Sequence, residues 1–359
     1  MLLKKIKLQH FRNYESQEAD FDEKLNVISG RNAQGKTNLL EAIHFLSTGR
    51  SFRTTRVYEL IQKGSKSLDV SGIVEKDGGI QRISIHYSEN RKSAHINERT
   101  VGRFHEIVGV LNTVAFTPDD MEIIKGFPSE RRRYLDMQIA MLNRGYLKNL
   151  YRYNEIVRQR NASLKARDKE MINIWNEELV KYGAYIVKER KGALERLSKH
   201  ACGQYMKITE RAETFEVLYR TEIAGEDIKE IEDSFHERLH AKTEVEFKNG
   251  ITMTGPHRDD LSFIIKGLDA RSYGSEGQRR SAVIALRLAQ YELAKEISKD
   301  TPVILIDDIT AELDPVRKRA FLPLLEEKGQ VFAATASGDE NFAEWRNAKV
   351  FKVENGRMF

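Results

Sequence analysis

The sequence is poor in cysteine, proline and tryptophan. Its 359 residues include one cysteine, six prolines and two tryptophans. The lone Cys202 excludes an internal disulfide, and no metal-ligand or redox spacing surrounds it, so we interpret it as a packing residue in a reducing compartment. No purely apolar run is long enough to span a bilayer, and the first residues alternate lysine with apolar side chains as an edge strand does. We therefore expect a cytoplasmic, globular protein with no membrane partner.

The charge of the chain excludes no class of partner. Charged residues make up 31% of the sequence and hydrophobic residues 40%, and the formal net charge is +5 with an isoelectric point near 9.0. Such mild basicity permits a nucleic-acid partner without requiring one. The length is sufficient for two or three lobes with cores of their own.

The sequence pattern changes from strand-like to helical and then back to strand-like. Strand-like patterns precede residue 118 and return after about residue 244, whereas residues 119–213 look almost wholly helical. We therefore predict an α/β fold in which residues 1–118 plus 245–359 form a discontinuous domain and residues 119–244 form an inserted, mainly helical lobe. The expected strands lie at 2–8, 25–29, 67–74, 81–86, 261–266, 303–306, 331–334 and 349–353, and the expected helices of the second half lie at 276–298 and 316–327.

Residues 30–37 read GRNAQGKT and fit G-x-x-x-x-G-K-[ST], the Walker A phosphate-binding loop. Gly30 and Gly35 let the backbone turn so that its amides point inward at phosphate oxygens. Lys36 is placed to reach the β- and γ-phosphates, and Thr37 can offer its hydroxyl to Mg²⁺. We therefore predict that a nucleoside triphosphate is bound by the whole loop, which also contains Arg31, Asn32, Ala33 and Gln34.

A second motif supplies carboxylates. Residues 302–308 form an apolar run that ends in Asp307 and Asp308, as a buried parallel strand does where ligands bind at its carboxyl end. Asp307 is the Walker B candidate, which would hold Mg²⁺ through water together with Thr37, and Asp308 would orient the attacking water. We expect Lys36, Asp307 and Asp308 to carry ATP hydrolysis.

A third motif begins the predicted helix 276–298, where Tyr273–Arg280 reads YGSEGQRR. Ser275 and Gln278 have capping-box spacing, so the segment is a well-capped helix start, and such a start can also face a phosphate. A small-x-Leu-Asp turn at 311–314 follows the Walker B strand. The order of these motifs resembles ABC-type ATPase heads, in which the third motif serves the nucleotide of a second subunit.

Longer patterns resemble the RecF family over nearly the whole chain. They are FRNY at 11–14, PDDMEIIKGFPSERRRYLD at 118–136, TGPHRDD at 254–260, and LIDD at 305–308 followed by AELD at 311–314. Phe127 departs from the small residue expected at its position. The pattern at 254–260 suggests no role by itself.

This resemblance implies an ABC-type head that binds ATP and Mg²⁺, forms a homodimer in response, and clamps double-stranded DNA near single-strand gaps and junctions. It also implies a part in DNA replication, recombinational repair and the SOS response to DNA damage, in which RecO and RecR cooperate to load RecA. By similarity, Arg12, Asn13 and Asn38 contact the nucleotide. The γ-phosphate bound by the partner copy would be reached by Ser275, Gly277 and Gln278.

Two residues differ from transporter-type heads. Asp308 stands where many heads carry glutamate, and Thr335 stands where many carry a switch histidine. The shorter carboxylate and the missing imidazole predict a weak, DNA-stimulated ATPase whose slow hydrolysis serves as a timer or reset.

Basic side chains after the Walker A helix and in the helical insertion are the candidates for DNA contact. Lys and Arg bind phosphates without reading bases. Glu and Asp are interleaved throughout, so a solvated helix face is the simpler interpretation for any one of them. The candidates are Arg50, Arg53, Arg56, Arg131, Arg132, Arg133, Arg152, Arg158 and Arg160.

Three other classes share some of these motifs. The nucleotide-binding subunit of an ABC transporter has the same motif order, but it does not explain the basic helical insertion. A structural chromosome protein of the SMC type needs very long coiled coils, for which the chain has no room. A small-molecule P-loop kinase leaves the Gly274–Gln278 segment unexplained.

Overall fold

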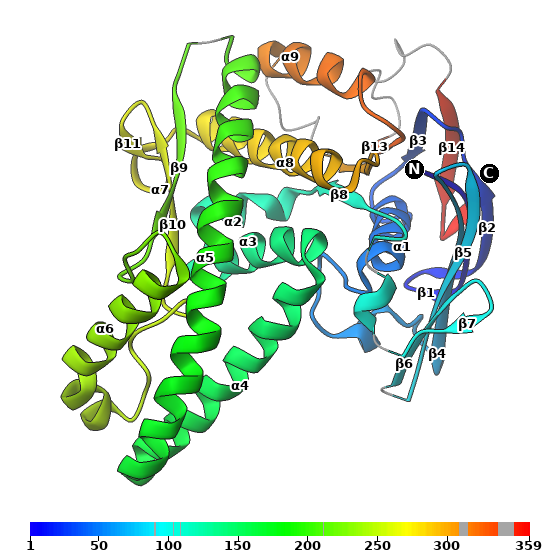
Figure 1. Cartoon of the computed structure of the whole chain (residues 1–359). Helices are drawn as coiled ribbons and strands as arrows, with labels where there is room; N and C mark the ends of the chain where they lie inside the picture. Colours follow the sequence, from blue (N-terminus) through cyan, green and yellow to red (C-terminus); the bar gives the residue numbers. More distant parts are fainter. Residues whose placement is uncertain (90, 103, 108, 211, 309–314, 337–347) are drawn as a thin grey trace. The chain divides into compact units, whose positions relative to one another are not determined.

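A computed structural model of the chain describes residues 1–359 except 90, 103, 108, 211, 309–314 and 337–347. The chain divides into two compact units that differ in secondary structure (Figure 1). Unit 1 comprises residues 1–120, 207–210 and 290–359, and unit 2 comprises residues 121–206 and 211–289. The expected division into an ATPase domain at 1–118 plus 245–359 and a helical insertion at 119–244 stays a prediction.

The first sheet of unit 1 is antiparallel, with strand order β2-β1-β4-β5-β6-β7. Buried and less buried positions alternate along β4, as expected for a sheet with one face on a core. Its strands are β1 (Leu2–Phe11), β2 (Tyr14–Asp20), β4 (Ser67–Lys76), β5 (Gly79–Ser88), β6 (Arg91–Ile96) and β7 (Arg99–Thr100).

The second sheet of unit 1 has the order β15-β14-β3-β13-β12-β8 and is parallel except for its edge strand β15. Every residue of β12 is buried, which fits a central strand covered on both faces. Its strands are β3 (Leu25–Gly30), β8 (Thr113–Phe116), β12 (Val303–Asp307), β13 (Val331–Ala336), β14 (Lys349–Glu354) and β15 (Arg357–Met358).

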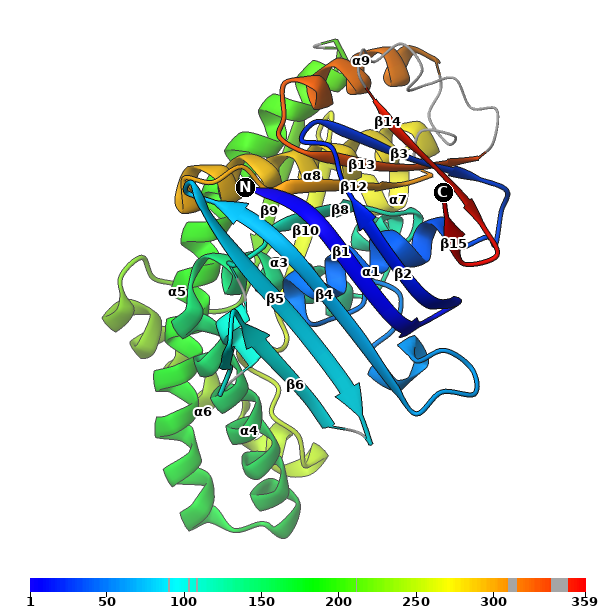
Figure 2. The ribbon, with the colours of Figure 1, turned by 90° about the vertical axis from the view of Figure 1, so that its right-hand side faces the viewer.

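Helix α1 (Lys36–Thr48) packs between these two sheets (Figure 2). Its buried residues, among them Leu39, Ile43 and Leu46, belong to one core with side chains from both sheets. The helix ends at Gly49, which adopts the left-handed conformation that glycine tolerates. The other helices wholly in unit 1 are η1 (Val57–Leu60), η2 (Phe104–Ile107) and α9 (Pro315–Glu326), and η3 (Pro118–Met121) lies at the boundary.

Unit 2 consists of helices and a three-stranded antiparallel sheet of order β11-β10-β9. Side chains of Asn143 and Asp227 cap the helices that follow them by accepting hydrogen bonds from backbone amides. The elements are α2 (Glu122–Lys125), α3 (Pro128–Leu142), α4 (Arg144–Ala166), β9 (Phe215–Arg220), α6 (Ile228–Asn249), β10 (Asp260–Ile265), β11 (Leu268–Asp269), α7 (Ala270–Tyr273), and the larger parts of α5 (Lys169–Ile208) and α8 (Glu276–Ser298).

The strands and helices expected from the sequence are present. The helix predicted at 276–298 has the bounds of α8, and the buried strand predicted at 303–306 is β12. The sequence did not predict strands β2, β6, β7, β8, β9, β11 and β15. Across the described part of the chain, no helix combines the length and the apolarity needed to cross a membrane.

Candidate nucleotide-binding site

The Walker A loop joins β3 to α1, both in unit 1. Gly35 has a φ of +124°, which a side chain would strain. A Cβ on Gly30 would lie 2.4 Å from the carbonyl oxygen of Val353, so only glycine lets β14 pass this close. The two glycines that the motif specifies are therefore required by the local backbone.

Lys36 is buried under this loop, with 4% of its surface exposed. Its Nζ donates to the carbonyl oxygens of Gly30 at 2.8 Å and Arg31 at 3.2 Å. Arg31, Asn32 and Ala33 are exposed at the top of the loop. The ammonium group is thus held at the centre of a loop whose outer residues are open to a ligand.

Thr37 and Asp307 meet although they lie 270 residues apart in the sequence. The Oγ1 of Thr37 donates to Oδ1 of Asp307 at 2.7 Å. Burial raises the pKa of Asp307 to about 6, the hydrogen bond from Thr37 opposes that rise, and the charge of Asp308 adds to it. A cation beside this pair would offset the cost of keeping the buried carboxylate ionised.

The pair formed by Thr37 and Asp307 fits Mg²⁺. This ion takes one or two protein oxygens and completes its shell with water and substrate phosphates. Among the described residues, no group of three or more His, Cys, Asp or Glu side chains could hold a metal ion by itself. A hydroxyl and a carboxylate beside a phosphate-binding loop therefore suit a metal that arrives with the nucleotide.

Asp308 directly follows β12 and has a φ of +50°, which is unusual for a residue other than glycine. Its backbone N–H donates to the carbonyl oxygen of Ala334 on β13 at 3.3 Å. Thr335, the next residue of β13, is buried and pairs with Ser29 of β3. The two residues that differ from transporter-type heads are therefore both at the carboxyl end of the parallel sheet, where the loop also begins.

Residues 13–14 and residues 355–356 hold the Walker A loop in place by hydrogen bonds, and we call these contacts the loop brace. The sequence analysis assigned this role to neither segment. The side chain of Asn13 donates from Nδ2 to the carbonyl oxygen of Gln34 at 2.8 Å. The backbone of the β14–β15 turn donates to the same residue, from Gly356 N to its carbonyl at 2.9 Å and from Asn355 N to its Oε1 at 2.7 Å. The hydroxyl of buried Tyr14 donates to the carbonyl of Gly35 at 3.0 Å. The Asn-Gly dipeptide is a turn signal that the sequence shows.

Helix α1 carries a fully buried carboxylate, Glu41. The guanidinium of Arg12 donates to both of its oxygens, and Ser51 donates to one of them. Arg53 lies 3.6 Å from Glu41 and donates to Oδ1 of Asn38 at 2.9 Å. Arg12 and Asn38, both expected at the nucleotide by similarity, are thus joined through Glu41 and Arg53.

The Asn38 side chain connects this cluster to the loop brace. Its Nδ2 donates to Oδ1 of Asn13 at 2.8 Å, while Asn13 donates to Gln34. A continuous set of hydrogen bonds therefore runs from the Walker A loop to Arg53. No motif in the sequence marks Glu41, whose role depends on tertiary contacts.

The third motif lies in unit 2, where the expected capping box is formed. Ser275 Oγ accepts from Gln278 N at 3.2 Å, and Gln278 Oε1 accepts from Ser275 N at 2.8 Å. Ser275 and Glu276 are exposed, and Lys125 holds Glu276 at 2.6 Å. Helix α8 therefore begins with ordered polar groups that are accessible to a ligand.

Two arginines expected at DNA, Arg131 and Arg160, are buried, with 2% of each exposed. Arg131 makes two hydrogen bonds to Asp260, at 2.6 and 2.9 Å, and Arg160 donates to fully buried Glu246 at 2.6 Å. A phosphate cannot reach a guanidinium that protein encloses, so neither arginine is placed to contact DNA. The other candidates are at least partly exposed: Arg50, Arg53, Arg56, Arg132, Arg133, Arg152 and Arg158.

Side chains of the 254–260 motif contact several elements of unit 2. His257 contacts the Tyr153 hydroxyl through Nδ1 at 2.6 Å and the carbonyl of Thr252 through Nε2 at 3.1 Å. The carboxylate of Asp259 accepts from the Tyr219 hydroxyl. The motif therefore ties α4 and β9 to the start of β10, which is a structural role.

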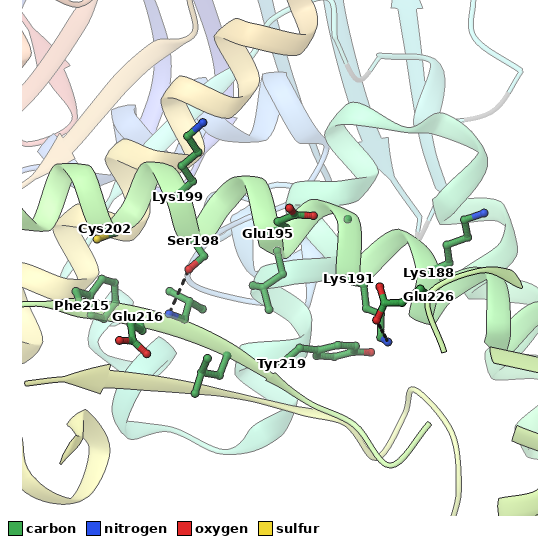
Figure 3. Close-up of a pocket in the computed structure, with 14 residues that line it drawn as sticks. Lys188, Lys191, Glu195, Ser198, Lys199, Cys202, Phe215, Glu216, Tyr219 and Glu226 are labelled. Carbon is green, nitrogen blue, oxygen red and sulfur yellow. Dashed lines mark hydrogen bonds and ion pairs between the residues drawn. The ribbon is translucent and has the colours of Figure 1, made fainter. Parts of the chain in front are cut away.

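A cavity of about 720 Å³ lies along α5 and β9 of unit 2 (Figure 3). Its lining includes Lys188, Lys199, Cys202 and Glu216. No residue predicted for the nucleotide or DNA is in this lining, so the cavity is separate from the site built above. The turn expected at 311–314 lies outside the described residues.

Comparison with known proteins agrees with this geometry. The model of the family described as RecF/RecN/SMC N terminal domain matches residues 2–358. The DNA replication and repair protein RecF of Streptococcus gordonii is 36% identical over 361 residues, covering 100% of both chains. The protein of the same name from Lachnoclostridium phytofermentans is 35% identical over 366 residues, covering 100% of this chain and 99% of that one.

Solved structures give the same result. A structure of the recombination mediator protein RecF with ATP, in the RecFOR pathway, has a TM-score of 0.92 at 35% identity, covering 100% of this chain and 97% of that chain. An Smc head bound to the C-winged helix domain of ScpA has a TM-score of 0.58 at 19% identity over 100% of this chain and 97% of that chain, and this shows a shared fold alone. The predicted ABC-type head is confirmed, and the chain belongs to the RecF family.

Proposed function

We propose that this protein is an Mg²⁺-dependent ATPase that acts on DNA in replication and recombinational repair. The observation that carries the proposal is the 2.7 Å contact between Thr37 of the Walker A helix and Asp307 at the end of β12. This contact places a hydroxyl and a carboxylate at one point beside the loop, which is the arrangement that P-loop ATPases use for their metal.

The loop amides, Lys36 and Asp308 have different tasks in this proposal. The inward amides from Gly30 to Thr37 cradle the phosphates, and the Lys36 ammonium moves from its carbonyl partners to the β- and γ-phosphate oxygens. Mg²⁺ held by Thr37 and Asp307 would neutralise charge that develops on the phosphates during hydrolysis. Asp308 would orient the attacking water, and its short side chain should make turnover slow.

We propose that ATP joins two copies of the chain. The Walker A loop binds the triphosphate in one copy, and Ser275, Gly277 and Gln278 of the other copy reach the γ-phosphate. The exposure of this helix start supports the arrangement. Hydrolysis then removes the group that links the two copies, so ATP controls whether the dimer exists.

The dimer would hold DNA through phosphate contacts made by the exposed arginines of both units. We expect it to act on double-stranded DNA near gaps and junctions, in the cytoplasm, together with RecR and RecO in the loading of RecA. The names of the relatives support this pathway. A transporter subunit, the main alternative, is disfavoured because the similarity to RecF relatives extends over the full length.

Sizing by light scattering, with and without ATP and gapped DNA, tests the mechanism. We expect a monomer without ATP, a dimer with ATP, and a dimer–DNA complex that dissociates after hydrolysis. Ser275→Arg should bind ATP normally but remain a monomer, because the larger side chain blocks the approach of the γ-phosphate. A wild-type protein that stays monomeric under all these conditions would contradict the proposal.

A further inference from the structure

The side chain of Gln278 is held at both ends of its amide. Its Oε1 accepts from the backbone N–H of Ser275 at 2.8 Å. Its Nε2 donates to Oε1 of Glu213 at 2.8 Å. Glu213 belongs to neither the capping box nor any motif found in the sequence.

Glu213 is itself fixed by a buried tyrosine. The hydroxyl of Tyr205, near the end of α5, donates to Glu213 Oε2 at 2.7 Å. Tyr205 is fully buried, and its ring stacks on Phe215, the first residue of β9, at a centroid distance of 4.9 Å. Figure 3 shows Phe215 opposite the stretch of α5 that carries Cys202.

These contacts determine which way the Gln278 amide faces. An ionised carboxylate can only accept hydrogen bonds, so it selects the NH₂ end of the amide. The oxygen is then left for the N–H of Ser275, which can only donate. With alanine at 213 the amide could rotate, and the first turn of α8 would lose one of its anchors.

We propose that Glu213 is a positioning residue for the ATP-dependent dimer. It orients Gln278 and thereby fixes Ser275 and Gly277 in the geometry that meets the γ-phosphate of the partner copy. The inference rests on the proposed function. It also defines a link from Tyr205 of α5 through Glu213 to Gln278.

Titration of dimer formation with a slowly hydrolysed ATP analogue tests this role. Glu213→Ala should raise the concentration at half-maximal dimerisation by about tenfold or more, since both sites of a symmetric dimer lose hydrogen bonds. Binding of a fluorescent ATP analogue to the monomer should be unchanged, because the Walker A loop is in unit 1. Glu213→Gln should restore most of the dimerisation, since its amide oxygen can still accept from Gln278.

Tyr205→Phe is the matched variant for the second half of the link. It keeps the buried ring and its stacking but removes the hydroxyl, so we expect a smaller shift in the same direction. Thermal unfolding of each variant identifies a folding defect. A folded Glu213→Ala variant that dimerises like the wild type would overturn the inference alone, whereas a wild type that never dimerises overturns the proposed function with it.

A mixing experiment separates positioning across the dimer from a general structural effect. Lys36→Ala damages the loop and leaves the α8 start intact, and Glu213→Ala does the reverse. In a mixed dimer, the intact loop of one chain meets the intact α8 start of the other, so mixing should restore ATP hydrolysis above the sum of the separate variants. No gain on mixing, with both chains folded, would refute action across the dimer.

Discussion

Arg12 is joined to Glu41 by two hydrogen bonds, of 2.8 Å from Nε and 2.7 Å from Nη2, and the carboxylate they reach is fully buried. The planar guanidinium fits the carboxylate in this two-pronged geometry. The orientation of Arg12 is therefore fixed in the protein itself, before any nucleotide is bound.

Truncation of Glu41 tests this pair. Glu41→Ala leaves Arg12 without a carboxylate partner, and breaking a buried pair from one side typically costs about 3–5 kcal/mol of unfolding free energy. Urea unfolding measures the change. Glu18→Ala is the control, because its pair with Lys5 is exposed to solvent and should contribute much less to stability. Similar losses in both variants would contradict the importance of the buried pair.

Lys36→Arg should separate ATP binding from hydrolysis. The guanidinium keeps the positive charge, but it cannot occupy the narrow position in which Nζ lies between two loop carbonyls. We expect hydrolysis to fall by about a hundredfold or more, as when one stabilising donor is lost, with a smaller effect on ATP affinity. Steady-state phosphate release and equilibrium nucleotide binding measure the two quantities. Equal losses in both would count against the assigned role.

The C-terminal turn should be essential to the Walker A loop. A Cβ on Gly356, which has a φ of +72°, would lie 2.1 Å from the carbonyl oxygen of Asn13. Gly356→Ala should therefore displace the turn from Gln34 and weaken ATP binding. Gly78→Ala is a close control, since Gly78 has a φ of +73° and nothing within 4 Å of its added Cβ. If the two variants bind ATP equally well, the brace has no role in the site.

Exposed and buried arginines should differ when they are replaced. Arg56→Gln or Arg133→Gln should weaken DNA binding and reduce the salt dependence of the affinity by about one unit of slope for each lost phosphate contact. Arg160→Gln should instead lower the unfolding free energy, because it leaves the carboxylate of Glu246 buried without a cation beside it. Binding titrations at several salt concentrations, with urea unfolding in parallel, measure both effects. An unchanged slope in Arg56→Gln and Arg133→Gln would remove these residues from the DNA surface.

His257 should make the stability depend on pH. Burial lowers the pKa of His257 from 6.5 to about 4, and the charges of Arg258, Arg132 and Arg160 act in the same direction. The unfolded chain then takes up a proton more readily than the folded one, so the stabilisation is complete above pH 6.5 and is lost as the pH falls toward 4. The full effect is about 3 kcal/mol. In His257→Gln, unfolding measured from pH 7.5 to 4.5 should show a flatter profile, and an unchanged profile would assign the effect to other groups.

The sequence predicted the elements with strong local patterns. The apolar run of β12 and the capped start of α8 both carry their signal within a few residues, and both are where the sequence placed them. Strand β2, which reads YESQEAD, has too few apolar residues to be found, and its conformation depends on pairing with β1. Elements with a strong local preference can therefore be predicted from the sequence, whereas elements that depend on tertiary pairing cannot.

The candidate site follows the same division. The Walker A loop and Asp307 were predictable because their chemistry is written in short motifs. Arg131 and Arg160 looked like surface cations, because their partners are 129 and 86 residues away and no local pattern announces a buried pair. The contact of Gln34 with Asn355 spans 321 residues, so only the folded chain shows it.

The long separation of Gln34 and Asn355 in the sequence has a consequence for the kinetics of folding. Contacts between distant segments form late, because the entropy of closing a long loop must be overcome first. The α1 helix can form early, but β3 pairs with β13 and β14, so the strand and the brace behind the loop are complete only when these distant strands have joined it. High-affinity nucleotide binding would then mark the end of folding in unit 1, so unfinished copies could not compete for ATP or enter a dimer.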